Sequence, residues 1–158
     1  VEWEKSADAA RQAGLRVVHP RVGVVLSPDG GALAQMLTPF KLGVGGRIGD
    51  GRQFMSWISL SDIVSLLVFC LENEAVAGPV NAVAPEPVRN QVFVKSLGKV
   101  LGRPTLIPVP KLGISTLFGQ MGDELLLAST RGSADRVLGL GFQFAHPSLE
   151  GALRAELT

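Results

Sequence analysis

The amino-acid sequence predicts an α/β fold. Segments rich in valine and isoleucine, which favour strands, alternate along the 158 residues with amphipathic segments that favour helices. The composition, 46% hydrophobic and 18% charged, is that of a chain with a real hydrophobic core and excludes a disordered one. The connecting segments hold most of the 19 glycines and 10 prolines, and such loops commonly bring backbone close to a ligand.

The first predicted element is a helix over residues 1–14, because this segment is rich in alanine and ends in glycine. Valine-rich residues 15–26 then predict two strands. Pro20 predicts either a break between them or a strand edge, since proline lacks the N–H that a strand ladder uses. A short helix is expected over residues 32–37, stopped near Pro39.

The middle of the chain begins with residues 42–46, which are too rich in glycine for a helix or a strand. Residues 49–51 (Gly-Asp-Gly) predict a turn that leads into a strand over residues 53–58. Ser and Asp at positions 61–62 then resemble the N-cap of a helix. That helix is apolar almost all round over residues 63–71, so we expect it to be buried on most of its surface.

The second half continues with a short strand over residues 80–83 and a helix that is capped by Asn90 and stopped by Gly102. We then expect an extended segment over residues 104–110 and a helix over residues 111–119. A capped helix is expected over residues 133–140, a strand with period-two alternation over residues 141–145, and a final capped helix over residues 149–157.

Charge and cysteine content exclude several classes of function. The net charge of +1 gives no field typical of a nucleic-acid-binding protein. Cys70 is the one cysteine, so an internal disulfide is excluded, and His19 and His146 lack partners at ligand spacing, so we expect no metal site. The sequence shows no signal peptide and no apolar stretch long enough for a membrane span, which predicts a cytoplasmic protein.

The absence of tyrosine restricts the chemistry further, because a mechanism that needs a tyrosine proton donor cannot run within this chain. Residues 43–49 hold glycines at dinucleotide-like spacing, but they lack the strand–turn–helix context of that fingerprint. Lys41, Arg47 and Arg52 flank flexible backbone and are either ligands of an anionic substrate or solvated loop charges. Trp57 is either a core residue or a pocket wall.

Several motifs resemble the extended short-chain dehydrogenases. They are Arg21-Val-Gly-Val-Val-Leu-Ser-Pro28, the run from Ile48 to Asp62, and Gly78-Pro-Val-Asn-Ala-Val-Ala-Pro85. A closer resemblance, covering essentially the whole chain, is to an atypical NAD-dependent epimerase/dehydratase-like branch, whose members are called nucleoside-diphosphate-sugar epimerases and carry a C-terminal domain of unknown function. The sequence motifs that support this closer resemblance include Met36-Leu-Thr-Pro-Phe-Lys-Leu-Gly43, Gly51-Arg-Gln-Phe-Met-Ser-Trp-Ile58, Asn81-Ala-Val-Ala-Pro-Glu-Pro-Val-Arg-Asn90 and Gly141-Phe-Gln-Phe144.

The resemblance implies the C-terminal half of such a protein. Residues 1–110 would be the last strands and helices of a Rossmann-like sheet together with a small substrate-binding α/β subdomain. Residues 111–158 would be a small extension packed on it. The N-terminal Rossmann half, with its glycine turn and a catalytic tyrosine, would lie upstream and be this chain's partner.

The resemblance also assigns site residues. The backbone of Arg21, Val22, Gly23 and Val24 would pass the nicotinamide end of NAD or NADP. The walls of the substrate pocket would come from Gly30, Gly31, Leu33, Met36, Phe40, Lys41, Arg52 and Trp57. Met55 departs from the general pattern, in which an arginine binds nucleotide-sugar phosphates, and Val24 and Leu26 replace the usual asparagine and tyrosine.

Two functions follow as hypotheses. In the first, the chain is the substrate-binding half of an NAD(P)-dependent epimerase or oxidoreductase of a small molecule and is not catalytically competent alone, because it holds no catalytic residue. In the second, the fold serves as a non-catalytic NAD(P)-sensing or protein-interaction module. Neither predicts a metal, nucleic-acid or membrane partner. Both predict self-association of the chain by itself, because uncovered strand edges and apolar patches would be exposed.

Overall fold

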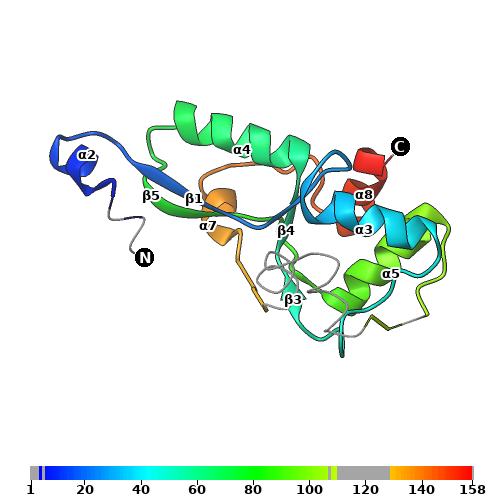
Figure 1. Ribbon diagram of the computed structural model, residues 1–158. Helices are drawn as coiled ribbons and strands as arrows, with labels where there is room; N and C mark the ends of the chain where they lie inside the picture. The colour runs from blue at the N-terminus through cyan, green and yellow to red at the C-terminus, as the bar shows by residue number, and fades with distance from the viewer. Residues whose placement is uncertain (1–3, 5, 107, 110–128, 158) are drawn as a thin grey trace.

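The computed structural model describes residues 4, 6–106, 108–109 and 129–157, and within them helices and strands alternate (Figure 1). In chain order the elements are α2 (Asp8–Gln12), β1 (Val18–Val22), β2 (Val24–Leu26), α3 (Gly31–Lys41), β3 (Phe54–Met55), β4 (Trp57–Ser59), α4 (Leu60–Glu72), β5 (Gly78–Ala82), β6 (Val88–Arg89), α5 (Asn90–Leu101), α7 (Asp135–Gly139) and α8 (Leu149–Leu157). The expected helix over residues 111–119 lies outside the described residues.

Parallel strand pairs form the centre of the fold. β1 pairs with β5 from Val18 opposite Gly78 to Val22 opposite Ala82, and β2 pairs in parallel with β4. A shorter antiparallel pair, β3 with β6, extends to one side. Parallel strands joined through helices are the expected α/β arrangement, because a parallel connection needs a long crossover.

Two hydrophobic clusters lie on opposite sides of the β3–β4 segment. Met55 and Trp57 belong to the first cluster, between α3, α5 and α8, whereas Ile58 belongs to the second, between α4, β5 and α7. Figure 1 shows the same division, with α3, α5 and α8 gathered at one end and α4 lying along β1 and β5. Side chains alternate between the two faces of an extended chain, so this short segment contributes to both cores.

Of the two alternatives at Pro20, the structure shows the strand edge and not the break. Pro20 lies inside β1, and the break comes at Gly23. Backbone N–H groups alternate between the two edges of a strand, and the N–H of Gly23 donates to Ala82 on the β5 side. The Pro20 nitrogen therefore faces the other edge of β1, where the described residues supply no partner strand, and a proline is tolerated there.

Two helices also differ from prediction at their ends. α3 does not stop before Pro39 but continues to Lys41, because Phe40 in its last turn is buried in the first cluster. α4 is capped by Ser59 and not by the predicted pair at 61–62: the Ser59 side chain accepts a hydrogen bond from the Asp62 N–H.

Asn90 does not cap α5, because it lies inside the first turn of the helix. It is fully buried there, and its Oδ1 accepts a hydrogen bond from the N–H of Ile48 at 2.9 Å. The predicted stop of this helix at Gly102 is confirmed by the left-handed φ of +63° at that residue.

The strand predicted over residues 53–58 is divided at Ser56 into β3 and β4, and the strand predicted over residues 141–145 is absent. In the latter segment Phe142 instead packs edge-on against Phe69 and Phe144, with ring centroids 5.4 and 4.9 Å away. The alternation of apolar and other residues over 141–145 therefore reflects the packing of Phe142 and Phe144 beside α4, and not the pairing of a strand.

α4 is buried on one side only, which contradicts the prediction that most of its surface is covered. An apolar stripe runs along its other side, with each member at least 40% exposed: Leu60, Val64, Leu67, Val68 and Leu71. Within the described part of the chain, no helix has both the length and the apolar character needed to cross a membrane.

Candidate functional site

A cleft of about 370 Å³ opens at the carboxyl ends of β1 and β5. Its lining comes from four segments that are far apart in the sequence: Pro20, Arg21, Val22, Gly23, Ser56, Asn81, Val83, Thr130 and Gly132. In open α/β sheets, ligands bind outside the carboxyl ends of the parallel strands. The position of the cleft in the fold is therefore that of a ligand site.

Three hydrogen bonds hold the segment after residue 129 against the cleft. The Ser56 hydroxyl donates to the carbonyl of Thr130 at 2.9 Å and accepts from the N–H of Gly132 at 2.8 Å. The amide of Asn81 donates to the carbonyl of Ser133 at 3.0 Å. Side chains at the ends of the strands thus fix one wall of the cleft.

Gly23 and Gly132 allow backbone segments to approach closely here. A Cβ at Gly23 would lie 2.7 Å from the carbonyl oxygen of Ser56, which is closer than real Cβ atoms come. A Cβ at Gly132 would lie 3.3 Å from both the Ser56 hydroxyl and the Val83 side chain. Close packing requires glycine at position 23, since Gly23 does not have a left-handed φ, and it leaves little room for a side chain at position 132.

Arg21 is the charged residue of the cleft wall. It lies opposite Asn81 in the β1–β5 register. Its guanidinium donates from Nε and Nη2 to the two carboxylate oxygens of Glu4, at 2.9 and 3.1 Å. The hydrogen bond from Arg21 lowers the pKa of Glu4 below its usual value, and the same bond raises the pKa of Arg21. The bidentate pair fixes the plane of the guanidinium at the cleft.

The structure brings Arg21, Val22 and Gly23, three of the four residues predicted to contact the cofactor, into this cleft. Val24 lies just beyond it, donates its N–H to the carbonyl of Ser56 and packs against the first core cluster. Sequence reasoning missed Ser56, Asn81, Thr130 and Gly132. Asn81 lies within one of the family motifs, but nothing in the sequence showed that residues 130 and 132 return to the same place.

The predicted substrate-binding residues lie away from the cleft. Leu33, Met36, Phe40 and Trp57 are buried in the first core cluster, and the Trp57 indole N–H donates to the carbonyl of Glu86 at 3.0 Å. Gly30, Gly31, Lys41 and Arg52 are exposed. A role for these eight residues in substrate binding stays a prediction.

The histidines serve local contacts. His19 is buried, with its Nε2 2.5 Å from the Arg11 guanidinium, and the His146 N–H donates to the Asp62 carboxylate. No group of three or more potential ligands that could hold a metal ion occurs in the parts of the chain that the structure describes.

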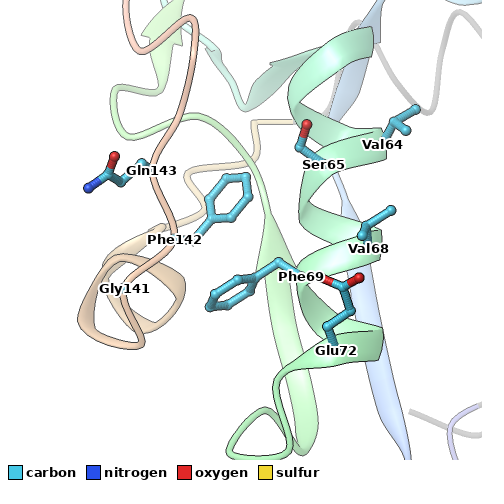
Figure 2. Close-up of a pocket in the computed structure, with 8 residues that line it drawn as sticks. All are labelled: Val64, Ser65, Val68, Phe69, Glu72, Gly141, Phe142 and Gln143. Atoms are coloured by element: carbon cyan, nitrogen blue, oxygen red, sulfur yellow. The ribbon is translucent and has the colours of Figure 1, made fainter.

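A second, shallower groove of about 490 Å³ runs between α4 and the segment after α7. Figure 2 shows Phe69 and Phe142 turned toward each other within it. Its other lining residues are mainly apolar or small, and Glu72 is the one charged residue among them. The groove shares no residue with the cleft and has no convergent polar groups, so it does not have the character of a catalytic site.

Comparison with known proteins gives a consistent result. Residues 109–156 match a family model described as a domain of unknown function, DUF1731. An epimerase family protein from Mycobacterium bovis is 43% identical over 97% of this chain and 51% of its own length. The chain therefore spans about half the length of the curated relatives that it matches.

Solved structures agree with this. The crystal structure of a human epimerase family protein with NADPH has a TM-score of 0.82 and 40% identity, and the match covers 89% of this chain and 48% of that one. A nucleoside-diphosphate sugar epimerase from Corynebacterium glutamicum has a TM-score of 0.78 and 32% identity, over 98% of this chain and 29% of that one. These matches confirm the α/β, Rossmann-like fold. The chain is similar to epimerase family proteins over nearly its whole length and about half of theirs, in keeping with a C-terminal half.

Proposed function

We propose that the intact protein is an NAD(P)-dependent epimerase or oxidoreductase and that this chain supplies the wall of the site on the nicotinamide side. The observation that carries the proposal is the cleft at the carboxyl ends of β1 and β5, which holds Arg21, Val22 and Gly23. The similarity to a human relative whose structure contains NADPH supports the choice of cofactor.

The residues of the cleft fit one end of a dinucleotide. The amide of Asn81 and the guanidinium of Arg21 are side by side on neighbouring strands and can pair with a neutral polar ring substituent or a ribose hydroxyl. Val22 and Val83 offer apolar surface to a flat ring. When bound, NAD(P) supplies hydride exchange, while the protein supplies position and exclusion of water.

The chain by itself is proposed to be inactive. Arg21 is the one ionisable residue among those that line the cleft in the described structure, and an arginine stays protonated at all working pH values. A general acid or base must therefore come from elsewhere in the intact protein. We expect no turnover from this chain alone under conditions in which the intact protein is active.

The test is a fluorescence titration of the intact protein with NADPH, comparing Val22→Glu with Val92→Glu. Both valines are about half exposed, but Val92 lies on α5 away from the cleft. A carboxylate at position 22 would face an anionic cofactor, so Val22→Glu should weaken NADPH binding about tenfold or more, and Val92→Glu should not. Equal affinities in the two variants, or no NADPH binding by the unsubstituted protein, would overturn the proposal.

The lack of an acid or base in the cleft also favours a second candidate, a non-catalytic NAD(P)-sensing module. The two functions separate in one experiment. Binding of NADPH without turnover of any alcohol or ketone substrate supports the sensing module, whereas measurable turnover by the intact protein excludes it.

A further inference from the structure

We infer that Ser56 is a positioning residue that holds residues 129–133, which we call the C-terminal wall, against the cleft. The C-terminal wall belongs to the segment that matches the domain of unknown function, so the inference gives that domain a role. The domain completes the cleft, and ligand binding depends on how firmly it is docked. The inference rests on the proposed function, because it takes NAD(P) as the ligand of the cleft.

The C-terminal wall lies between β3 and α7 and has no regular secondary structure. Two of its residues, Thr130 and Gly132, line the cleft. Thr130 is exposed and Gly132 is partly exposed. Such a segment lacks the internal hydrogen bonds of a helix or a sheet, so its place depends on the bonds that it makes with neighbouring elements.

The hydroxyl of Ser56 holds the C-terminal wall at two points. It donates to the carbonyl of Thr130 at 2.9 Å and accepts from the N–H of Gly132 at 2.8 Å. A hydroxyl has one proton, and the bond to Thr130 uses it, so Ser56 cannot donate to a ligand while the wall is docked. Ser56 is also only 4% exposed. It therefore acts on a ligand through the C-terminal wall.

The backbone of Ser56 is tied to a different part of the cleft, the segment after β1. Its carbonyl accepts a hydrogen bond from the N–H of Val24 at 2.8 Å. Gly23, which lines the cleft, comes so close that a Cβ there would lie 2.7 Å from the same oxygen. Ser56→Ala keeps this backbone link and removes only the link to the C-terminal wall.

Other hydrogen bonds hold the two ends of the C-terminal wall. At its start, the Ser129 hydroxyl accepts from the N–H of Phe54, and the N–H of Thr130 donates to the carbonyl of Phe54, both at 3.1 Å. At its end, the amide of Asn81 donates to the carbonyl of Ser133 at 3.0 Å. Loss of the central bonds should therefore loosen the wall without detaching it.

Docking of the C-terminal wall and binding of a ligand are coupled. Thr130 and Gly132 supply part of the lining, so a ligand in the cleft binds the docked form more tightly than a form in which the wall has moved away. The apparent dissociation constant then increases as the docked fraction falls, and the ligand in turn increases the docked fraction. A purely structural role of Ser56 would give neither effect.

The experiment compares Ser56→Ala with Ser59→Ala in the intact protein. Ser59 is the matched control, because it is also buried and its hydroxyl also makes two hydrogen bonds, at 3.1 and 2.8 Å, with the N–H and carboxylate of Asp62. It does not line the cleft. A second variant, Ser129→Ala, removes one bond of the C-terminal wall at an exposed residue outside the lining, and decides the question if Ser56→Ala does not fold.

Two quantities are measured on each form after thermal melting has shown that it is folded. The first is NADPH affinity, by fluorescence titration. The second is the rate of hydrogen exchange of a peptide over residues 129–133, by mass spectrometry, with and without NADPH. The exchange rate reports on docking of the C-terminal wall directly, and its measurement without NADPH does not depend on the proposed function.

We expect Ser56→Ala to weaken NADPH binding about fivefold or more and Ser129→Ala to weaken it about twofold, with Ser59→Ala unchanged although it also melts at a lower temperature. NADPH should slow exchange over residues 129–133 in the unsubstituted protein. Ser56→Ala should speed that exchange when NADPH is absent, and Ser59→Ala should not.

Equal NADPH affinity in Ser56→Ala and the unsubstituted protein, an equal loss in Ser59→Ala, or exchange over residues 129–133 that neither NADPH nor Ser56→Ala alters would overturn the inference and leave the proposed function in place. Failure of the unsubstituted protein to bind NADPH would refute the proposed function. The exchange comparison without NADPH would then still decide whether Ser56 holds the C-terminal wall.

Discussion

The carboxylate of Asp62 in α4 accepts a hydrogen bond of 2.7 Å from the backbone N–H of Ala145, which lies 83 positions later in the chain. The same carboxylate accepts from the His146 N–H and from the Ser59 hydroxyl. Asp62 is 1% exposed. A single buried side chain thus holds the Ser59 hydroxyl that caps α4 and attaches the C-terminal segment to the helix.

Asp62→Asn should therefore lower the stability of the protein. The amide offers one acceptor oxygen where the carboxylate offers two, so at least one buried N–H loses its partner at a cost of about 2–4 kcal/mol. The measurement is the urea midpoint, with Asp50→Asn in an exposed turn as the control. Equal midpoints for the two variants would contradict the role of Asp62.

Gly23→Ala should also destabilise the protein, for a steric reason. The new Cβ would lie 2.7 Å from the backbone oxygen of Ser56, and backbone cannot give way cheaply, so we expect a loss of about 1–3 kcal/mol. Gly139→Ala in α7 is the matched control, because a Cβ there meets nothing within 4 Å. Thermal unfolding should show a lower Tm for Gly23→Ala and an unchanged or higher one for Gly139→Ala.

Glu150 should make stability depend on pH. Hydrogen bonds from Lys99 and then Arg154 lower its pKa below the usual 4.5. A carboxylate with a depressed folded-state pKa stabilises the protein above its unfolded-state pKa, and this contribution is lost as pH falls through the folded-state value.

The stability difference between the unsubstituted protein and Glu150→Gln should therefore be present at pH 7 and vanish in strong acid. Urea unfolding across this pH range measures it. Glu74→Gln, at an exposed residue outside the ion pairs of the described structure, should show no such change. A difference that persists unchanged at low pH would mean that the ion pairs with α5 and within α8 do not carry it.

Cys70 should react slowly with thiol reagents. It is buried in α4, and desolvation raises the pKa of its thiol, so little of the reactive thiolate forms at neutral pH. Labelling with a thiol-specific chromogenic reagent should be slow in the native protein and fast after denaturation. Rapid labelling of the native protein would show that this part of α4 opens readily.

The chain on its own should self-associate, with a second copy as the occupant of the α4 stripe. Five apolar side chains at least 40% exposed lie along one helix, next to a strand, β1, that has one described partner. Sedimentation over a range of concentrations should show a mass that increases with concentration, and Leu67→Lys with Leu71→Lys should reduce it. A monodisperse monomer at all concentrations would refute this prediction.

The sequence by itself determined the alternation of strands and helices and the positions of most elements. Valine-rich runs, the glycine stop at Gly102 and the final amphipathic helix act through local propensity and spacing, which depend on neighbours in the sequence. The family motif at Arg21 to Gly23 likewise identified three residues that line the cleft.

Tertiary structure decided the features that depend on contacts between distant segments. Pro20 is tolerated because of the edge that it faces, α3 runs past Pro39 because Phe40 is anchored in the core, and 141–145 is not a strand because Phe142 packs on α4. The cleft wall from Thr130 to Gly132 and the contacts of Arg89 and Arg131 with the Phe54 ring also join segments that are distant in the sequence. Burial and pairing energies exceed local preferences by enough to override them, and a linear pattern does not show which segments will meet.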